Sequence, residues 1–488
     1  RLHFPGAYSL LFRVRPLSVA LAGVVLVRLL TLSGYPILDR TEARYAYIGE
    51  LMVQTGNWIT PFFDHNVPLW AKPILSFWLT AASFSVFGIN AFAARLPAFL
   101  IFISVCWITF ALGRGERDKE FGLAAATIFA STSLAFYLGG TVMTDPALML
   151  GIALTMTGFW KAVGHPDNNS WAWKYSFFVG VSIGTLAKGP VAILLPGLSI
   201  ALWITQHRKW NDTWRRLPWL TGTALTLVLV IPWYALAEIR TPGFLRYFIV
   251  GEHLGRFLIP HWSGDLYGQG RGWPRGTIWL FGLVAVLPWS VSLIILLFRR
   301  ESRSALFKRS NLSDPWLSYL LCWLLVPLVV FTFSAHTLPT YVAPSLCAFA
   351  LLCACGLRRY GDWAGRYGFA ATAAIVPFLF LAAVIAITIN PGARYLPTQA
   401  NIYAALRHLT AGSQLSPNYV FNFPYSAKFY TSGHAKFLRD EHELATALDK
   451  GEQYFVIPVN KYPTLSADLR QRFEIITEKN GHLLLRSK

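Results

Sequence analysis

Two charged residues that stand alone between apolar residues are the first candidates for chemistry in this sequence. Asp145 lies in a Thr-Asp-Pro sequence and Lys188 in a Lys-Gly-Pro sequence, and each marks the border of a long apolar run. An ionised group at such a border is costly unless it is paired or faces a water-filled cavity. We therefore expect both side chains to have a function.

Further cations and carboxylates lie in the polar segments between other apolar runs. Cations bind phosphate through charge-assisted hydrogen bonds, and the candidates are Arg44, Lys72, Lys188 and Arg256. Carboxylates accept or orient the proton of an acceptor hydroxyl, and the candidates are Asp39, Glu42 and Asp145. The sequence has no P-loop and no Gly-x-Gly-x-x-Gly after a strand, so nothing indicates a nucleotide donor. A donor that is itself a lipid phosphate suits this set.

The composition places these residues in a membrane protein. Of the 488 residues, 54% are hydrophobic and 14% are charged, whereas soluble domains average about 25% charged residues. The mean hydropathy is +0.44, and the apolar residues form runs of roughly 17 to 22, long enough for a helix to cross a bilayer. These features exclude a soluble fold, a secreted disulfide scaffold and a disordered protein. The five cysteines fall inside apolar runs, so we expect no disulfide.

The distribution of positive charge predicts the topology. The net charge of +19 comes from basic residues in short segments between apolar runs, which is typical of the positive-inside rule rather than of nucleic-acid binding. A short run at 73–88 is expected to lie in the interface, because its crossing would turn the basic clusters at 206–216 and 299–309 outward. The N-terminus is then inside and the C-terminus outside. The eleven expected spans are 17–35, 96–113, 121–138, 146–163, 175–187, 190–206, 217–238, 277–298, 315–333, 338–357 and 368–389.

These spans predict an all-α polytopic membrane domain at residues 1–391, with the first apolar run kept as a helix. Its outer loops are 36–95, with interfacial helices, and 239–276, so the candidate residues share the outer face. The tail at 392–488 gains charged residues and is expected to form a small α/β domain on that face. Its strand-like runs are 419–423, 454–459, 473–477 and 483–485, with a short helix at 440–448.

Ordered motifs between residues 17 and 357 resemble those of a known family. They are Thr41-Glu42-Ala43-Arg44-Tyr45-Ala46, Gly56-Asn57-Trp58-Ile59-Thr60-Pro61, Lys72-Pro73, Thr144-Asp145-Pro146, Ala187-Lys188-Gly189, Pro232-Trp233, Glu252-His253-Leu254-Gly255-Arg256-Phe257, Leu287-Pro288-Trp289 and Leu338-Pro339-Thr340-Tyr341. Each motif is weak alone, but their succession is similar to that of bacterial GT-C glycosyltransferases of the lipid A aminoarabinose transferase (ArnT-like) and protein O-mannosyltransferase group. The tail is not covered by these motifs.

The resemblance implies a GT-C fold and a reaction at the periplasmic face of the bacterial inner membrane. Such enzymes transfer a sugar from an undecaprenyl-phosphate carrier to a lipid A-like or other envelope acceptor, with inversion of the anomeric centre. The implied partners are this donor, a lipid or glycan acceptor and membrane lipids, without nucleic acid. Clamping the departing phosphate lowers the barrier. The family's cavity positions fall on Arg44, Tyr45, Lys72, Asp145, Lys188, His253, Arg256 and Tyr341.

Three positions depart from the family pattern. Thr41 replaces an Asp that usually precedes the Glu of the first motif, Ala71 replaces a Glu before Lys-Pro, and Thr337 replaces a Lys. The general base is therefore open between Glu42, ranked slightly first, Asp39 and Asp145, which is otherwise expected to orient the acceptor. The change at Ala71 removes a metal ligand, so no cofactor is assigned and a divalent metal ion stays an open alternative.

Other functions remain as alternatives. Within enzymes, a related GT-C transferase would act on a protein or glycan acceptor. A lipid-linked sugar transporter or flippase is less favoured, because its ionisable residues would lie near the bilayer midplane in broken helices. A paralogue that only binds polyprenyl phosphate is the third alternative. The sequence identifies neither the sugar nor the acceptor.

Overall fold

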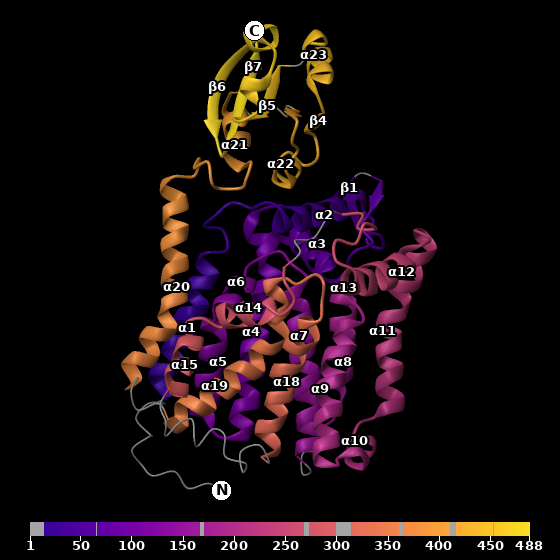
Figure 1. Cartoon of the computed structure of the whole chain (residues 1–488), viewed down its shortest axis with the longest axis vertical. Helices are drawn as coiled ribbons and strands as arrows, with labels where there is room; N and C mark the ends of the chain where they lie inside the picture. Colours follow the sequence, from indigo (N-terminus) through magenta and orange to yellow (C-terminus); the bar gives the residue numbers. More distant parts are fainter. Residues whose placement is uncertain are drawn as a thin grey trace.

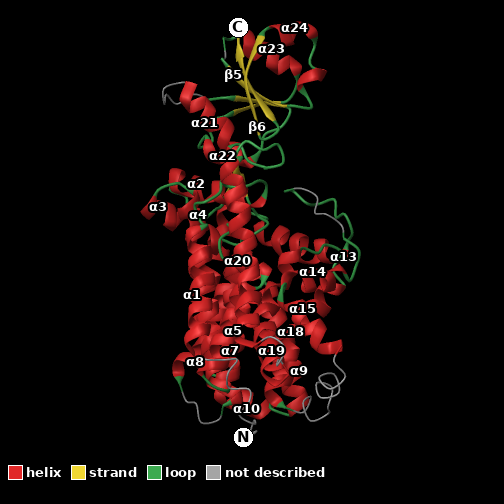
Figure 2. Ribbon diagram, turned by 90° about the vertical axis from the view of Figure 1, so that its left-hand side faces the viewer, coloured by secondary structure: helices red, strands yellow, loops and turns green. Residues whose placement is uncertain are grey.

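A computed structural model of the protein describes residues 14–64, 66–165, 170–267, 273–298, 314–360, 365–409, 416–451 and 453–488. A long bundle of helices carries a small domain with a β-sheet at one end (Figure 1 and Figure 2). The bundle helices are α1 (Val14–Leu30), α4 (Ala91–Glu116), α5 (Lys119–Ser131), α6 (Ser133–Leu138), α7 (Asp145–Phe159), α8 (Trp171–Lys188), α9 (Val191–His207), α11 (Trp219–Arg240), α14 (Thr277–Ala285), α15 (Trp289–Phe298), α18 (Pro315–Thr332), α19 (Leu346–Tyr360) and α20 (Gly365–Ile389). A π-helix, η2 (Trp160–Gly164), extends α7, and α10 (Trp210–Arg216) closes the far end.

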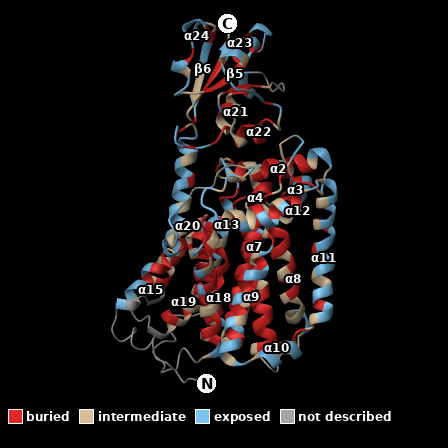
Figure 3. Ribbon diagram, turned by 45° about the vertical axis from the view of Figure 1, so that its right-hand side comes forward, coloured by how far each residue is buried: buried red, intermediate tan, exposed pale blue. Residues whose placement is uncertain are grey.

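The centre of the bundle is built from small residues that let helices approach closely. A side chain added at Gly151 of α7 would come within 2.6 Å of the backbone of Gly184, and one at Gly180 within 2.5 Å of the backbone of Gly151. Small residues at helix contacts are typical of membrane bundles, where packing rather than the hydrophobic effect holds helices together. Figure 3 shows buried residues along α7 and exposed residues along α11 and α20, which have outward apolar faces.

Six of the described helices are long and apolar enough to cross a membrane, and a bent pair adds a seventh. They are Ala91–Glu116, Asp145–Gly164, Trp219–Arg240, Pro315–Thr332, Pro339–Arg358 and Gly368–Ile389. The bent pair is α14 with α15, which meet at 103°, so the expected span 277–298 is not one straight helix. Pro288 lies between them, and proline interrupts a helix because it lacks an N–H group. The chain is a polytopic membrane protein, and the count of eleven spans stays a prediction.

The predicted outer loop at 36–95 contains two helices, and their placement in the membrane interface stays a prediction. They are α2 (Thr41–Thr55) and α3 (Leu75–Phe87), joined by the short hairpin β1 (Phe62–Asp64) and β2 (Val67–Pro68). The 13 residues of α3 extend about 20 Å, which is less than the ~30 Å of a hydrocarbon core. Both helices lie near the end of the bundle that faces the small domain (Figure 1). The segment predicted as the other outer loop forms α12 (Phe244–Arg246), η3 (Tyr247–Gly255) and α13 (Arg256–Leu258).

The C-terminal domain has a five-stranded mixed sheet in the order β4-β3-β5-β7-β6. Its strands are β3 (Asn418–Val420), β4 (Lys436–Leu438), β5 (Tyr454–Pro458), β6 (Phe473–Lys479) and β7 (His482–Ser487). Its helices are α21 (Ala400–Leu409), α22 (Tyr425–Tyr430), α23 (Glu441–Asp449), η5 (Tyr462–Thr464) and α24 (Ala467–Gln471). β3 pairs in parallel with β4 and β5, whereas β7 pairs antiparallel with β5 and β6. All four predicted strands and the predicted helix are present, and β4 is additional.

Helix α22 attaches this domain to the bundle. The backbone N–H of Ser426 donates to Asp39 at 2.8 Å, and its hydroxyl bonds the same carboxylate. Lys428 forms an ion pair with Asp64. The hydroxyl of Tyr430 accepts from the backbone N–H of residue 37 at 2.8 Å. The C-terminal domain is thus fixed directly over α2.

Candidate active site

A polar cavity of about 1060 Å³ lies between the C-terminal domain and the end of the bundle that faces it. Its walls come from α2, α7, α8, α13 and the turn before η4 (Pro339–Ser345), and from loops of the C-terminal domain. A second, mostly apolar cavity of about 410 Å³ runs between α9, α18 and η3. The two cavities share a set of lining residues: Ala71, Lys72, Lys188, Arg256, His336 and Tyr341. These six residues therefore lie where the mostly apolar cavity meets the polar cavity.

Lys72 and Arg256 meet at one buried carboxylate. Lys72 Nζ lies 3.0 Å from Glu252 Oε2, and Arg256 Nη1 lies 2.9 Å from the same oxygen. Burial alone would raise the pKa of Glu252, but the charges of Lys72 and Arg256 hold that pKa below its usual value. Glu252 is therefore ionised at neutral pH and neutralises part of the positive charge. Glu252 is not among the sequence-predicted site residues, although it shares a motif with His253 and Arg256.

Lys188 and Asp145 form the second ion pair, with Lys188 Nζ 2.6 Å from Asp145 Oδ1. Lys188 is the last residue of α8 and Asp145 the first of α7, so each charge lies at the helix end that favours its sign. Lys188 Nζ also lies 4.8 Å from the centre of the Tyr341 ring. Both residues line the polar cavity, which agrees with the expectation that they are not isolated in apolar surroundings.

Two histidines lie next to Lys188 and Arg256. The ring of His253 lies between the carbonyl oxygens of Phe248 at 2.8 Å and Lys188 at 3.1 Å, which ties η3 to the end of α8. His336 Nε2 lies 3.2 Å from Arg256 Nη2. Burial, assisted by the charge of Arg256, lowers the pKa of His336 to about 4. His336 is thus neutral at pH 7 and can accept from Arg256, and its Nδ1 bonds to no described residue.

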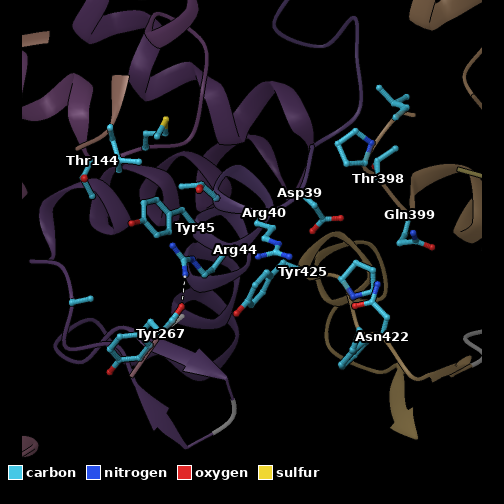
Figure 4. A pocket seen from close by; sticks show the side chains of 18 of the residues that line it. Asp39, Arg40, Arg44, Tyr45, Thr144, Tyr267, Thr398, Gln399, Asn422 and Tyr425 are labelled. Atoms are coloured by element: carbon cyan, nitrogen blue, oxygen red, sulfur yellow. Dashed lines mark hydrogen bonds between the residues drawn. The ribbon is translucent and has the colours of Figure 1, made fainter. Parts of the chain in front are cut away.

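Arg44 and Tyr45 come from α2 and line the polar cavity from the other side (Figure 4). Arg44 Nη1 lies 3.5 Å from the carbonyl oxygen of Tyr267. Its guanidinium carbon is 5.2 Å from the ring centre of Tyr45 and 5.8 Å from that of Tyr425. Among the described ion pairs Arg44 has no carboxylate partner, so its charge remains available to a ligand.

The three candidate carboxylates have different surroundings. Glu42 is buried and receives two hydrogen bonds from Arg95, at 2.8 and 2.9 Å. Asp39 lines the cavity, but both of its oxygens bond Ser426, and burial raises its pKa despite these bonds. Of these three, only Asp145 lines the cavity beside the cations, where Asp265 also lies, 3.6 Å from Arg256. The structure thus brings Asp145 and, less directly, Asp39 to the cavity, and it does not bring Glu42 there.

The positions that depart from the family pattern are also located. Thr41 and Ala71 line the polar cavity, so the missing carboxylates would have faced it. Thr337 is buried next to His336. Among the described residues, no three His, Cys, Asp or Glu side chains are grouped closely enough to hold a metal ion.

Comparisons with known proteins point to one group. Residues 25–248 match the family model described as dolichyl-phosphate-mannose-protein mannosyltransferase. An undecaprenyl phosphate-alpha-4-amino-4-deoxy-L-arabinose arabinosyl transferase of Pseudomonas fluorescens is 30% identical over 67% of this chain and 55% of its own. One from an Enterobacter species is 28% identical over 69% of this chain and 58% of its own. The chain therefore spans little more than half the length of these relatives.

A solved structure agrees over almost the whole chain. ArnT from Cupriavidus metallidurans, crystallised with undecaprenyl phosphate, superposes with a TM-score of 0.76 at 19% identity, over 96% of this chain and 97% of that one. The apo form gives 0.74. Such a likeness establishes the fold, which includes the C-terminal domain. With its membrane-spanning helices, the chain is a multi-pass inner-membrane protein that resembles, in sequence and in fold, the bacterial GT-C glycosyltransferases of the ArnT and protein O-mannosyltransferase group.

Proposed function

We propose that the protein is an inverting glycosyltransferase that moves a sugar from a polyprenyl-phosphate carrier to an envelope acceptor, with a lipid A-like glycolipid as the favoured acceptor. The observation that carries this proposal is the convergence of Lys72, Lys188 and Arg256 at the junction of an apolar and a polar cavity. A polyprenyl-phosphate sugar has an apolar chain, a phosphate and a sugar, which match the apolar cavity, the cations and the polar cavity in this order. The names of the relatives support the same donor class.

The apolar cavity suits the first part of the polyprenyl chain. Its walls include Leu148, Val191, Leu194, Phe248 and Phe257, which offer hydrocarbon surface and little hydrogen bonding. The cations would then bind the phosphate by charge-assisted hydrogen bonds. Glu252 and Asp145 pair with these cations, which offsets part of the cost of burying the positive charges.

The reaction needs one bond to form and one to break at the anomeric carbon. The acceptor hydroxyl attacks this carbon from the face opposite the phosphate, and polyprenyl phosphate leaves with the bonding electrons. Lys72, Lys188 and Arg256 stabilise the charge that develops on the phosphate. Asp145 accepts the hydroxyl proton once the phosphate competes for Lys188, since the other two candidate carboxylates are committed to Arg95 and Ser426.

The cavity is proposed to face the periplasm. It lies at the end of the bundle opposite α10 (Figure 1), whose segment carries Lys209, Arg215 and Arg216. Basic residues favour the cytoplasmic side. The other basic cluster used for this argument, 299–309, lies outside the described residues. The family model that matches is named for protein mannosyltransferases, so a protein acceptor is the second candidate.

The donor assignment is tested with purified protein in lipid nanodiscs and undecaprenyl phosphate as the probe. Lys188→Ala should bind the probe roughly 10-fold or more weakly, because a charge-assisted hydrogen bond is lost, and Lys188→Met, which keeps the packing of the side chain, should show the same loss. Lys209→Ala is the matched control, since Lys209 lies on the far end of the bundle. Equal binding by Lys188→Ala and the wild type would remove Lys188 from the site. The acceptor is tested by mass spectrometry of lipid A, glycolipids and envelope proteins from cells with and without the gene.

A further inference from the structure

The C-terminal domain supplies one complete wall of the polar cavity. We propose that Asn422 and Asn460, with Tyr425 and with Arg40, the residue before α2, form the acceptor subsite, which binds the sugar ring of a glycan headgroup. This inference rests on the proposed function and adds to it the part of the chain that recognises the acceptor. All four residues line the same cavity as the cation cluster, so a molecule held against this wall faces the donor end.

The sheet topology explains why two asparagines meet at this wall. β3 and β5 are adjacent and parallel, with Tyr419 opposite Val456. Asn422 follows the end of β3 by two residues, and Asn460 follows the end of β5 by two residues. Both side chains therefore leave the carboxyl edge of the parallel part of the sheet. This is the edge at which open sheets with parallel strands place their ligands.

The two asparagines are free to bind a ligand. Both are exposed, and neither side chain makes a hydrogen bond to the part of the chain that the structure describes, in contrast to Asn480 on the neighbouring turn, whose amide donates to residues 391 and 393. A carboxamide offers two donors and one acceptor oxygen, which matches the mixed donor and acceptor character of sugar hydroxyls. No hydrogen bond within the described part of the domain thus requires an amide at Asn422 or Asn460.

Tyr425 and Arg40 complete the wall. Tyr425 packs against Phe63 with ring centres 5.6 Å apart, and Figure 4 places it between Arg40, Arg44 and Asn422. Arg40 is exposed and takes part in no described ion pair. An aromatic ring, two amides and a guanidinium provide an apolar face and directional hydrogen bonds, as small-molecule sites commonly do.

The attachment of α22 keeps this wall in position. Asp39 accepts two hydrogen bonds from Ser426, the residue that follows Tyr425, and Lys428 pairs with Asp64. Asp39 thereby holds the start of α22 against α2. Its role is that of a positioning residue for the acceptor wall rather than of the general base.

The test uses cells that lack the gene and carry variants of it. The double variant Asn422→Ala/Asn460→Ala should form the envelope product about 10- to 100-fold less efficiently, because each lost hydrogen bond to a ligand weakens binding roughly threefold to tenfold. Its thermal stability and its affinity for undecaprenyl phosphate should match those of the wild type. Gln471→Ala is the control, since Gln471 is an exposed amide on α24 outside the cavity.

The outcomes separate this inference from the proposed function. A wild type that neither binds undecaprenyl phosphate nor forms a product would overturn the proposed function. A wild type that does both, with a double variant that forms as much product, would overturn the acceptor subsite alone. A double variant that loses affinity for undecaprenyl phosphate, or a product found on protein, would also contradict it. Product found on lipid A or on a lipid-free oligosaccharide supports it and identifies the source of the sugar ring.

Discussion

Arg95 holds Glu42 in a two-point ion pair, with Nε 2.8 Å from Oε1 and Nη2 2.9 Å from Oε2. The same guanidinium donates to the carbonyl oxygens of Leu32, Tyr35 and Pro36. Arg95, a buried residue of α4, thus fixes the segment 32–42 that leads into α2. The relationship turns the leading sequence candidate for the general base into a residue that holds α2, with Arg44 and Tyr45, at the cavity.

Replacing Glu42 should therefore lower the free energy of unfolding rather than act directly on the sugar transfer. Glu42→Gln leaves the charge of Arg95 buried and uncompensated, and breaking a buried pair in this way costs about 3–5 kcal/mol. We expect a clear drop in the midpoint of thermal unfolding, measured on detergent-solubilised protein. Arg95→Met should give a drop of similar size. A Glu42→Gln protein that melts like the wild type but has no turnover would restore Glu42 as the base.

Asp145 is expected to be the proton acceptor. Loss of a general base lowers turnover by about 10²–10⁴-fold, so Asp145→Asn should be nearly inactive. Its affinity for undecaprenyl phosphate should be unchanged or higher, because Lys188 no longer has an internal partner. Asp39→Asn is the comparison, and it should lose activity in parallel with its weakened attachment of α22. Full turnover in Asp145→Asn would leave the bound phosphate itself or a metal ion as the proton acceptor.

Glu50 should make stability depend on pH. Burial raises the pKa of Glu50 from 4.5 to about 8, and its described partners are Gln54 and Ser432. The folded protein then binds more protons than the unfolded chain between these values, so the free energy of unfolding falls as pH rises from 4.5 to about 8. Glu50→Gln removes this titration.

The measurement for Glu50 is the difference in unfolding midpoint between the wild type and Glu50→Gln from pH 5 to 9. This difference should shift in favour of the variant as the pH rises, because only the wild type acquires a buried charge. Glu474→Gln, on an exposed position of β6, controls for the change of an acid to an amide. A difference that is constant over this range contradicts the prediction.

The topology predicts that α10 faces the cytoplasm. A cysteine introduced at Asn211, in a background without the native cysteines, should be protected from an impermeant thiol reagent added to intact spheroplasts. A cysteine at Gln471, in the C-terminal domain, should react readily. Rapid labelling at position 211 would contradict both the interfacial placement of α3 and the periplasmic cavity.

The sequence by itself determined the features that depend on neighbouring residues. The apolar runs predicted a polytopic helical protein, because burial in lipid requires continuous hydrophobic segments. Short strand-like runs predicted the strands β3, β5, β6 and β7 of the C-terminal domain. The lone charges of Asp145 and Lys188 predicted a function for each residue, which stays a prediction, and only the structure shows that they pair at 2.6 Å.

The tertiary structure decided which of the polar residues are free to act. Glu42 is paired with a residue 53 positions later in the chain, and Asp39 with one 387 positions later. Hydropathy and motif spacing describe local sequence and contain no information about such partners. The acceptor wall has the same origin, since Asn422 and Asn460 become neighbours only through the parallel pairing of β3 with β5. A carboxylate or amide acquires its role from the groups that packing places beside it, and packing is a property of the whole fold.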